Sequence, residues 1–136
     1  MKSIILASGS PRRQELLRQV GIKFCVVTAD VDESPGRGRN ARSVCRRNAT
    51  AKAAQVAEQF PKQTVLGADT LVHLGDEMFG KPSSQAEARR MLRRLSGKTH
   101  RVTTACALIR GKRKRIFSVT TRVTFRELSD RQIRNY

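Results

Sequence analysis

The chain has 136 residues and a formal net charge of +17, because 28 Lys and Arg outnumber 11 Asp and Glu. This length fits one domain with a modest core, and no apolar run is long enough to cross a bilayer, which excludes a membrane-spanning helix. The excess of positive charge predicts binding of polyanions such as nucleotides, nucleic acids or acidic membranes. Solvated basic surfaces without a specific partner would give the same total.

The cysteines and the N-terminus indicate the compartment. The three cysteines are widely spaced and form no C-x-x-C pattern, so we expect reduced thiols rather than disulfides or zinc ligands. The N-terminal apolar stretch is too short for a signal peptide. These features predict a cytoplasmic protein.

The first elements are predicted to be two short strands with a helix between them. Residues 2–7 are typical of a short buried strand. Ser10 can cap the following helix, and Pro11 suits its first position. Gly21 ends this helix, and residues 24–28 are predicted to form the second strand.

A charged loop and a long helix follow. Residues 30–40 contain Pro, Gly and charged side chains and are predicted to form an exposed loop. An apolar stripe predicts a helix over 41–59, which ends before a proline. Strands are then predicted at 64–68 and 71–74, the second turning back at 77–79.

The next predicted helix opens with Ser84 and Glu87, which have the S-x-x-E spacing of a capping box. Gly97 closes this helix. Two strands joined by a tight turn are predicted at 102–109 and 116–125, where apolar and polar residues alternate.

The last helix is predicted to start at a second capping box, formed by Ser129 and Gln132, close to the end of the chain at Tyr136. The alternation of strands and helices predicts an α/β fold with a mixed sheet flanked by helices.

The loop between the first strand and the first helix is a candidate phosphate site. Free backbone N–H groups and the helix dipole attract anions at such a position. Ser8 and Ser10 add hydroxyl groups, and Arg12 and Arg13 can grip phosphate oxygens with paired donors. A capped helix with two solvent-facing arginines is the alternative interpretation.

Other polar residues are candidates for the chemistry. Asp69 follows an apolar strand, where a carboxylate can take a proton from water or help to hold a metal, and Thr70 offers a hydroxyl group beside it. Glu33 can bind a divalent metal from its loop. Lys52 and Lys81 can neutralise phosphate charge. Each of these residues also has an ordinary structural or solvated alternative.

Several short motifs occur together in one order along the chain. They are L-A-S-G-S-P-R-R at 6–13, Glu33, K-A at 52–53, G-A-D-T at 67–70, G-K-P at 80–82 and M-L-R-R-L-S-G at 91–97. With these motifs, the chain resembles the Maf family of nucleotide pyrophosphatases over essentially its whole length.

This resemblance implies an elongated mixed sheet with two lobes around a deep cleft, as in inosine-triphosphatase-like proteins. It also implies hydrolysis of nucleoside triphosphates between the α and β phosphates, with Mg or Mn as the divalent metal. The motifs S-P-R-R at 10–13 and G-A-D-T at 67–70 are similar to those of the branch that acts on dTTP and UTP.

The resemblance also implies the roles of individual residues. Asp69 would accept the proton and, with Glu33, bind the metal. Arg12 and Thr70 would influence the choice of substrate. The residues that bind the substrate would be Ser8, Arg12, Arg13, Lys52, Thr70 and Lys81.

Family members continue beyond the position of Tyr136 into a segment with a Gln that contacts the base. We therefore expect residues 1–136 to be a single Maf-like domain that is incomplete at its C-terminus. The expected partner is a nucleoside triphosphate, a homodimer is compatible with the sequence, and neither a membrane nor a nucleic acid is required. The alternatives are an inactive truncated fragment and a basic nucleic-acid-binding module.

Overall fold

The computed structural model describes residues 3–33 and 40–136. Its central feature is a six-stranded mixed sheet in the order β2-β1-β3-β5-β6, with β4 paired to β3. The strands are β1 (Ile4–Leu6), β2 (Phe24–Val26), β3 (Val65–Leu74), β4 (Glu77–Phe79), β5 (Thr99–Arg110) and β6 (Arg113–Thr124). The predicted α/β fold with a mixed sheet is confirmed.

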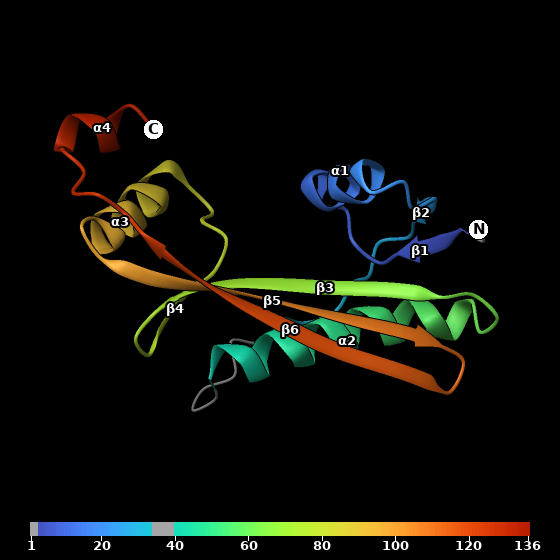
Figure 1. Ribbon diagram of the computed structural model, residues 1–136. Helices are drawn as coiled ribbons and strands as arrows, with labels where there is room; N and C mark the ends of the chain where they lie inside the picture. Colours follow the sequence, from blue (N-terminus) through green and yellow to red (C-terminus); the bar gives the residue numbers. More distant parts are fainter. Residues whose placement is uncertain (1–2, 34–39) are drawn as a thin grey trace.

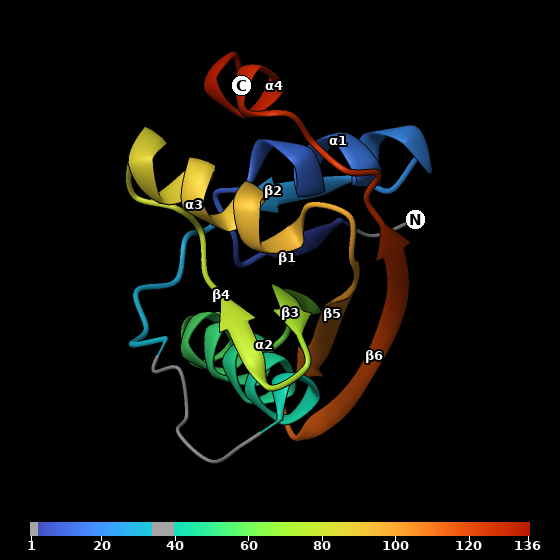
Figure 2. The same ribbon diagram turned by 90° about the vertical axis from the view of Figure 1, so that its left-hand side faces the viewer.

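The helices lie on both faces and at both ends of this sheet (Figures 1 and 2). They are α1 (Pro11–Gln19), α2 (Ala41–Gln59), α3 (Gln85–Leu95) and α4 (Asp130–Arg134). The sheet separates α1 from α2 near the N-terminus, whereas α3 and α4 lie at the other end of the long strands. No helix among residues 3–33 and 40–136 has the length and apolar character to span a membrane.

The core lies between α2 and the sheet. Small α2 side chains, among them Ala49 and Ala53, are fully buried against Val65 and against Ala105 and Ala107 of β5. Small residues on both elements allow a helix backbone to approach a sheet closely. The bounds of α2 match the prediction, and Asn40 caps it by accepting a hydrogen bond from the Ser43 N–H at 2.8 Å.

The predictions for β3 and α3 need correction. Residues 64–68 and 71–74 were predicted to be two strands, but β3 is one strand, and Asp69 lies inside it rather than after it. The box at Ser84 is only half present: the Ser84 hydroxyl accepts the Glu87 N–H, while the Glu87 carboxylate accepts from Ser83. The box at Ser129 has both of its hydrogen bonds.

The other strands and α1 differ in smaller ways. Strand β5 begins before the predicted residue, at Thr99, because its pairing with β6 continues to Thr124. Helix α1 has the predicted cap, yet it contains no buried residue, and Leu16 is 49% exposed. The predicted loop 30–40 lies partly outside the described residues, at 34–39.

Candidate active site

The site is built at an interruption in the edge of the sheet. Strand β1 pairs with β3 as far as Leu66, and β4 pairs with β3 from Val72 onward. Between these two pairings, that edge of β3 has no neighbouring strand among the described residues. Successive side chains of a strand point to opposite faces, and the open edge gives one cavity access to both Asp69 and Thr70.

The loop between β1 and α1 lies beside this open edge. The Ser8 hydroxyl oxygen accepts hydrogen bonds from the Ser10 N–H and from Arg13 Nη1, each at 3.2 Å. Ser10 caps α1 by accepting the Arg13 N–H at 3.4 Å. The small residues and the proline that define this segment therefore fix the start of α1, and with it the position of Arg13.

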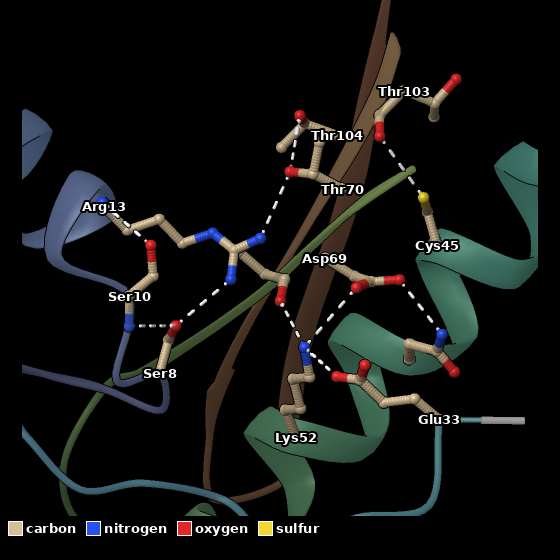
Figure 3. A network of polar contacts seen from close by, with 12 residues as sticks. Ser8, Ser10, Arg13, Glu33, Cys45, Lys52, Asp69, Thr70, Thr103 and Thr104 are labelled. Atoms are coloured by element: carbon tan, nitrogen blue, oxygen red, sulfur yellow. Dashed lines mark hydrogen bonds and ion pairs between the residues drawn. The ribbon is translucent and has the colours of Figure 1, made fainter. Parts of the chain in front are cut away.

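Arg13 connects this loop to β3. Its Nη2 donates to the Thr70 hydroxyl at 3.2 Å, and the Thr70 and Thr104 hydroxyl oxygens are 3.0 Å apart (Figure 3). The guanidinium thus spans the distance from the Ser8 loop to the sheet. Arg12 is exposed and does not line the cavity, so the structure separates the two adjacent arginines.

On the opposite face of β3, Asp69 meets α2. Lys52 Nζ lies 3.5 Å from Asp69 Oδ1, donates to the Ala68 carbonyl at 3.2 Å and forms an ion pair with Glu33 (Figure 3). Asp69 is 7% exposed. Lys52 therefore satisfies a carbonyl at the open edge and compensates the buried Asp69 carboxylate, as buried charge requires. It also pairs with the exposed Glu33.

Asn48 is a site residue that the sequence reasoning missed. Its Nδ2 donates to Asp69 Oδ2 at 3.1 Å in a buried hydrogen bond. The available signal was its position four residues before Lys52, which places both side chains on one face of a helix. The pairing with Asp69 depends on how α2 lies on β3, which no local pattern reveals.

Cys45 lies beneath the same carboxylate. Its thiol is fully buried and donates to the Thr103 carbonyl oxygen at 3.4 Å. Burial and then the negative charge of Asp69 raise the pKa of Cys45 to about 12. The thiol therefore stays protonated near neutral pH, and it adds no second negative charge beside Asp69.

A cavity of about 570 Å³ opens beside these contacts. Six of the predicted site residues line this cavity, namely Arg13, Glu33, Lys52, Asp69, Thr70 and Lys81. Ser8 bonds to Arg13 but does not line the cavity. Asn48 does line the cavity, although it was not predicted as a site residue. Lys81 follows β4, so cationic side chains reach the cavity from several elements.

The carboxylates of the site show whether it can bind a divalent metal ion. No group of three or more His, Cys, Asp or Glu side chains suited to a metal exists within residues 3–33 and 40–136. Glu33 and Asp69 nevertheless converge on one cation, the Lys52 ammonium. Mg²⁺ commonly binds through one or two protein carboxylates together with substrate phosphates, so this pair fits such an ion.

Comparison with protein families identifies the chain. Residues 3–136 match the family described as Maf-like protein. The chain belongs to the Maf family. Among curated relatives, the dTTP/UTP pyrophosphatase of Akkermansia muciniphila is 47% identical over 98% of this chain and 70% of its own length. The protein of the same name from Myxococcus xanthus is 49% identical, over 98% of this chain and 67% of its own length.

The Maf fold also resembles a solved structure with a different sequence. The Staphylococcus aureus Ham1 protein has a TM-score of 0.64 and 18% identity, over 89% of this chain and 70% of that one. This likeness concerns the fold alone. It agrees with the mixed sheet and flanking helices described above.

Proposed function

We propose that this Maf chain is a nucleoside triphosphate pyrophosphatase, which hydrolyses dTTP and UTP to the monophosphate and pyrophosphate. The observation that carries the proposal is the buried Asp69 carboxylate, in a cavity that Arg13, Lys52 and Lys81 also line. A polyanion and a proton acceptor can meet there. The names of relatives that are 47–49% identical support the choice of substrate.

The triphosphate would lie along the loop before α1. Gly9, Ser10 and Pro11 line the cavity there, and the N-terminus of α1 favours negative charge. The Arg13 guanidinium would bind two phosphate oxygens, and Lys52 and Lys81 would neutralise further charge. Most of the catalysis would come from positioning and from electrostatic stabilisation of the departing pyrophosphate.

Asp69 would act as the general base. It would take a proton from a water molecule whose oxygen forms a new bond to the α-phosphorus, while the bond from that phosphorus to the bridging oxygen breaks. A positioned base typically accelerates a reaction by about 10²- to 10⁴-fold. The products would be a nucleoside monophosphate and pyrophosphate.

Glu33 and Asp69 would hold a divalent cation, Mg or Mn, together with phosphate oxygens. Such an ion, when bound, neutralises charge on the phosphates. The ion pairs with Lys52 hold both carboxylates close to the cavity. When a triphosphate is present, the Lys52 ammonium can exchange its ion pairs with the carboxylates for ion pairs with the phosphates.

The proposal includes a cellular location and an oligomeric state. Three free thiols, at Cys25, Cys45 and Cys106, support a cytoplasmic location. The proposed assembly is a homodimer. Light scattering of the purified chain would give its mass directly.

The test is pyrophosphate release from dTTP, UTP, CTP, ATP and GTP with Mg or Mn, beside an Asp69→Asn control. We expect turnover that favours dTTP and UTP in the wild-type chain. The control should lose about 10²- to 10⁴-fold in kcat and still bind the nucleotide. Full turnover in Asp69→Asn would remove Asp69 from the role of base, and a folded wild-type chain without turnover would overturn the proposed activity.

A further inference from the structure

Asn48 is an uncharged partner of the carboxylate on which the proposed reaction depends. It lies on α2, one turn before Lys52, and its side chain is 6% exposed among the buried polar groups. The amide Nδ2 donates to Asp69 Oδ2 at 3.1 Å. An asparagine amide buried at this position therefore serves one purpose visible in the contacts, which is to hold Asp69.

The two oxygens of Asp69 have different kinds of partner. Oδ2 meets the neutral amide of Asn48, whereas Oδ1 lies 3.5 Å from the charged Nζ of Lys52. An incoming triphosphate competes with Asp69 for Lys52, and a divalent cation competes with Lys52 for Asp69, since all these groups interact through charge. Neither competes strongly for a neutral amide donor, so the contact of Oδ2 with Asn48 persists when the contact of Oδ1 with Lys52 weakens.

The helix that carries Asn48 cannot shift easily. Its neighbour Ala49 is fully buried, and the α2 backbone lies so close to Gly67 of β3 that a side chain at Gly67 has no space. An asparagine side chain is short, so the backbone position fixes where its amide reaches. The donor is therefore already in place before the substrate binds.

We propose that Asn48 is a positioning residue: it anchors Asp69 Oδ2 so that Oδ1 faces the cavity and accepts the proton of the attacking water. This inference rests on the proposed function. It assigns a role to a residue that touches neither the water nor the reacting phosphorus, and it explains why a buried amide lies among the apolar side chains of α2 that pack on the sheet.

The first test replaces Asn48 by Leu, which has a similar size and no donor. We expect kcat for dTTP to fall about 10- to 100-fold, the loss typical of one hydrogen bond to a charged group. The KM should stay within about 2-fold, because Asn48 does not bind the phosphates in this scheme. Thr50→Ala is the matched control, since within the described part of the chain the Thr50 hydroxyl bonds only to the Arg46 carbonyl of its own helix.

The second test uses Asn48→Asp, which keeps the shape of the side chain. Two facing carboxylates repel each other, so kcat should fall further than in Asn48→Leu. A purely structural role for Asn48 does not predict this order, because aspartate keeps the shape of the side chain better than leucine does.

The outcomes separate the two proposals. An active wild-type chain with an equally fast Asn48→Leu variant would overturn the positioning role alone, as would a higher KM with unchanged kcat. An Asn48→Asp variant as fast as the wild-type chain would also overturn it, even if Asn48→Leu fails to fold. A folded wild-type chain without turnover would overturn the proposed function first, and the positioning role with it.

Discussion

Gly67 of β3 lies directly against the backbone of Ala49 on α2. A Cβ atom at Gly67 would be 2.8 Å from the Ala53 backbone N, and it would be closer still to the Ala49 carbonyl oxygen. This close approach brings Asn48 and Lys52 within reach of Asp69, two residues further along β3. The glycine of the G-A-D-T motif therefore sets the distance between the helix and the strand that together build the site.

Replacing Gly67 by Ala should destabilise the fold. The atoms that the new methyl group meets belong to the backbone of α2, so no side chain can rotate away, and overpacking of this kind typically costs about 1–3 kcal/mol. Chemical denaturation would measure the loss. Gly80→Ala is the matched control because nothing lies within 4 Å of that position, and equal stability of the two variants would contradict the close-approach argument.

The adjacent arginines should behave differently. Arg13 lines the cavity and bonds to both Ser8 and Thr70, whereas Arg12 is exposed and lies outside the lining. Arg13→Ala should raise the KM for dTTP about 10- to 100-fold, as expected for the loss of charge-assisted hydrogen bonds. Arg12→Ala should change it much less. A larger effect of Arg12 on the ratio of dTTP to CTP turnover would instead support the role in substrate choice that the family resemblance implies.

The sequence predicted helices better than it predicted the long strands. Helix α2 has a regular apolar stripe and is followed by Pro61, and these local signals predicted its bounds. Strand β3 was divided in two because Asp69 and Thr70 interrupt its apolar pattern. Those polar residues are tolerated in mid-strand because they lie where one edge of β3 is open, and Asn48, Lys52 and Arg13 satisfy their side chains on the two faces.

The sequence could predict most of the residues that belong to the site, because each of those lies in a short local motif. Most of the predicted residues do surround one cavity. The sequence could not predict the contacts between site residues, because the partners are far apart along the chain. Arg13 and Thr70 are 57 positions apart, and Asn48 and Asp69 are 21 apart. These pairings depend on strand register and on the depth of α2 against β3, which are properties of the packed fold.

Alkaline pH should destabilise the protein through Cys45. Burial and the charge of Asp69 raise the pKa of this thiol from about 9 to about 12. The folded state therefore keeps the proton at a pH where the unfolded state releases it, so the contribution to stability is complete below about pH 9 and is lost as the pH rises towards 12. Within this window, the free energy of unfolding should fall by up to about 1.4 kcal/mol per pH unit.

Other groups also titrate above pH 9, so the measurement is a comparison between variants. Urea denaturation at pH 8 and pH 10 should show a smaller loss of stability in Cys45→Ala than in the wild-type chain. Cys25 provides an internal contrast, because it is exposed and should react with a thiol reagent in the native protein while Cys45 reacts only on unfolding. An identical dependence on pH in wild type and Cys45→Ala would show that the thiol is not protected by the fold.

The net charge of +17 should accelerate capture of the anionic substrate. A positive surface raises the rate of encounter with anions, and salt screens this attraction. We therefore expect kcat/KM for dTTP to fall steeply with added NaCl while kcat changes less. Chloride could also compete directly with phosphate at Arg13, so salt alone does not separate long-range attraction from local competition.

Changes of charge in the hairpin formed by β5 and β6 can distinguish long-range attraction from local competition. Arg113 and Arg115 are exposed near its turn and do not line the cavity, and replacing both by Glu lowers the net charge from +17 to +13, since each change removes two charges. If long-range attraction matters, this double variant should have a lower kcat/KM at low salt, an unchanged kcat and a weaker dependence on salt. If its kcat/KM equals that of the wild-type chain at every salt concentration, the basic hairpin does not serve nucleotide capture, and the salt effect belongs to the phosphate site itself.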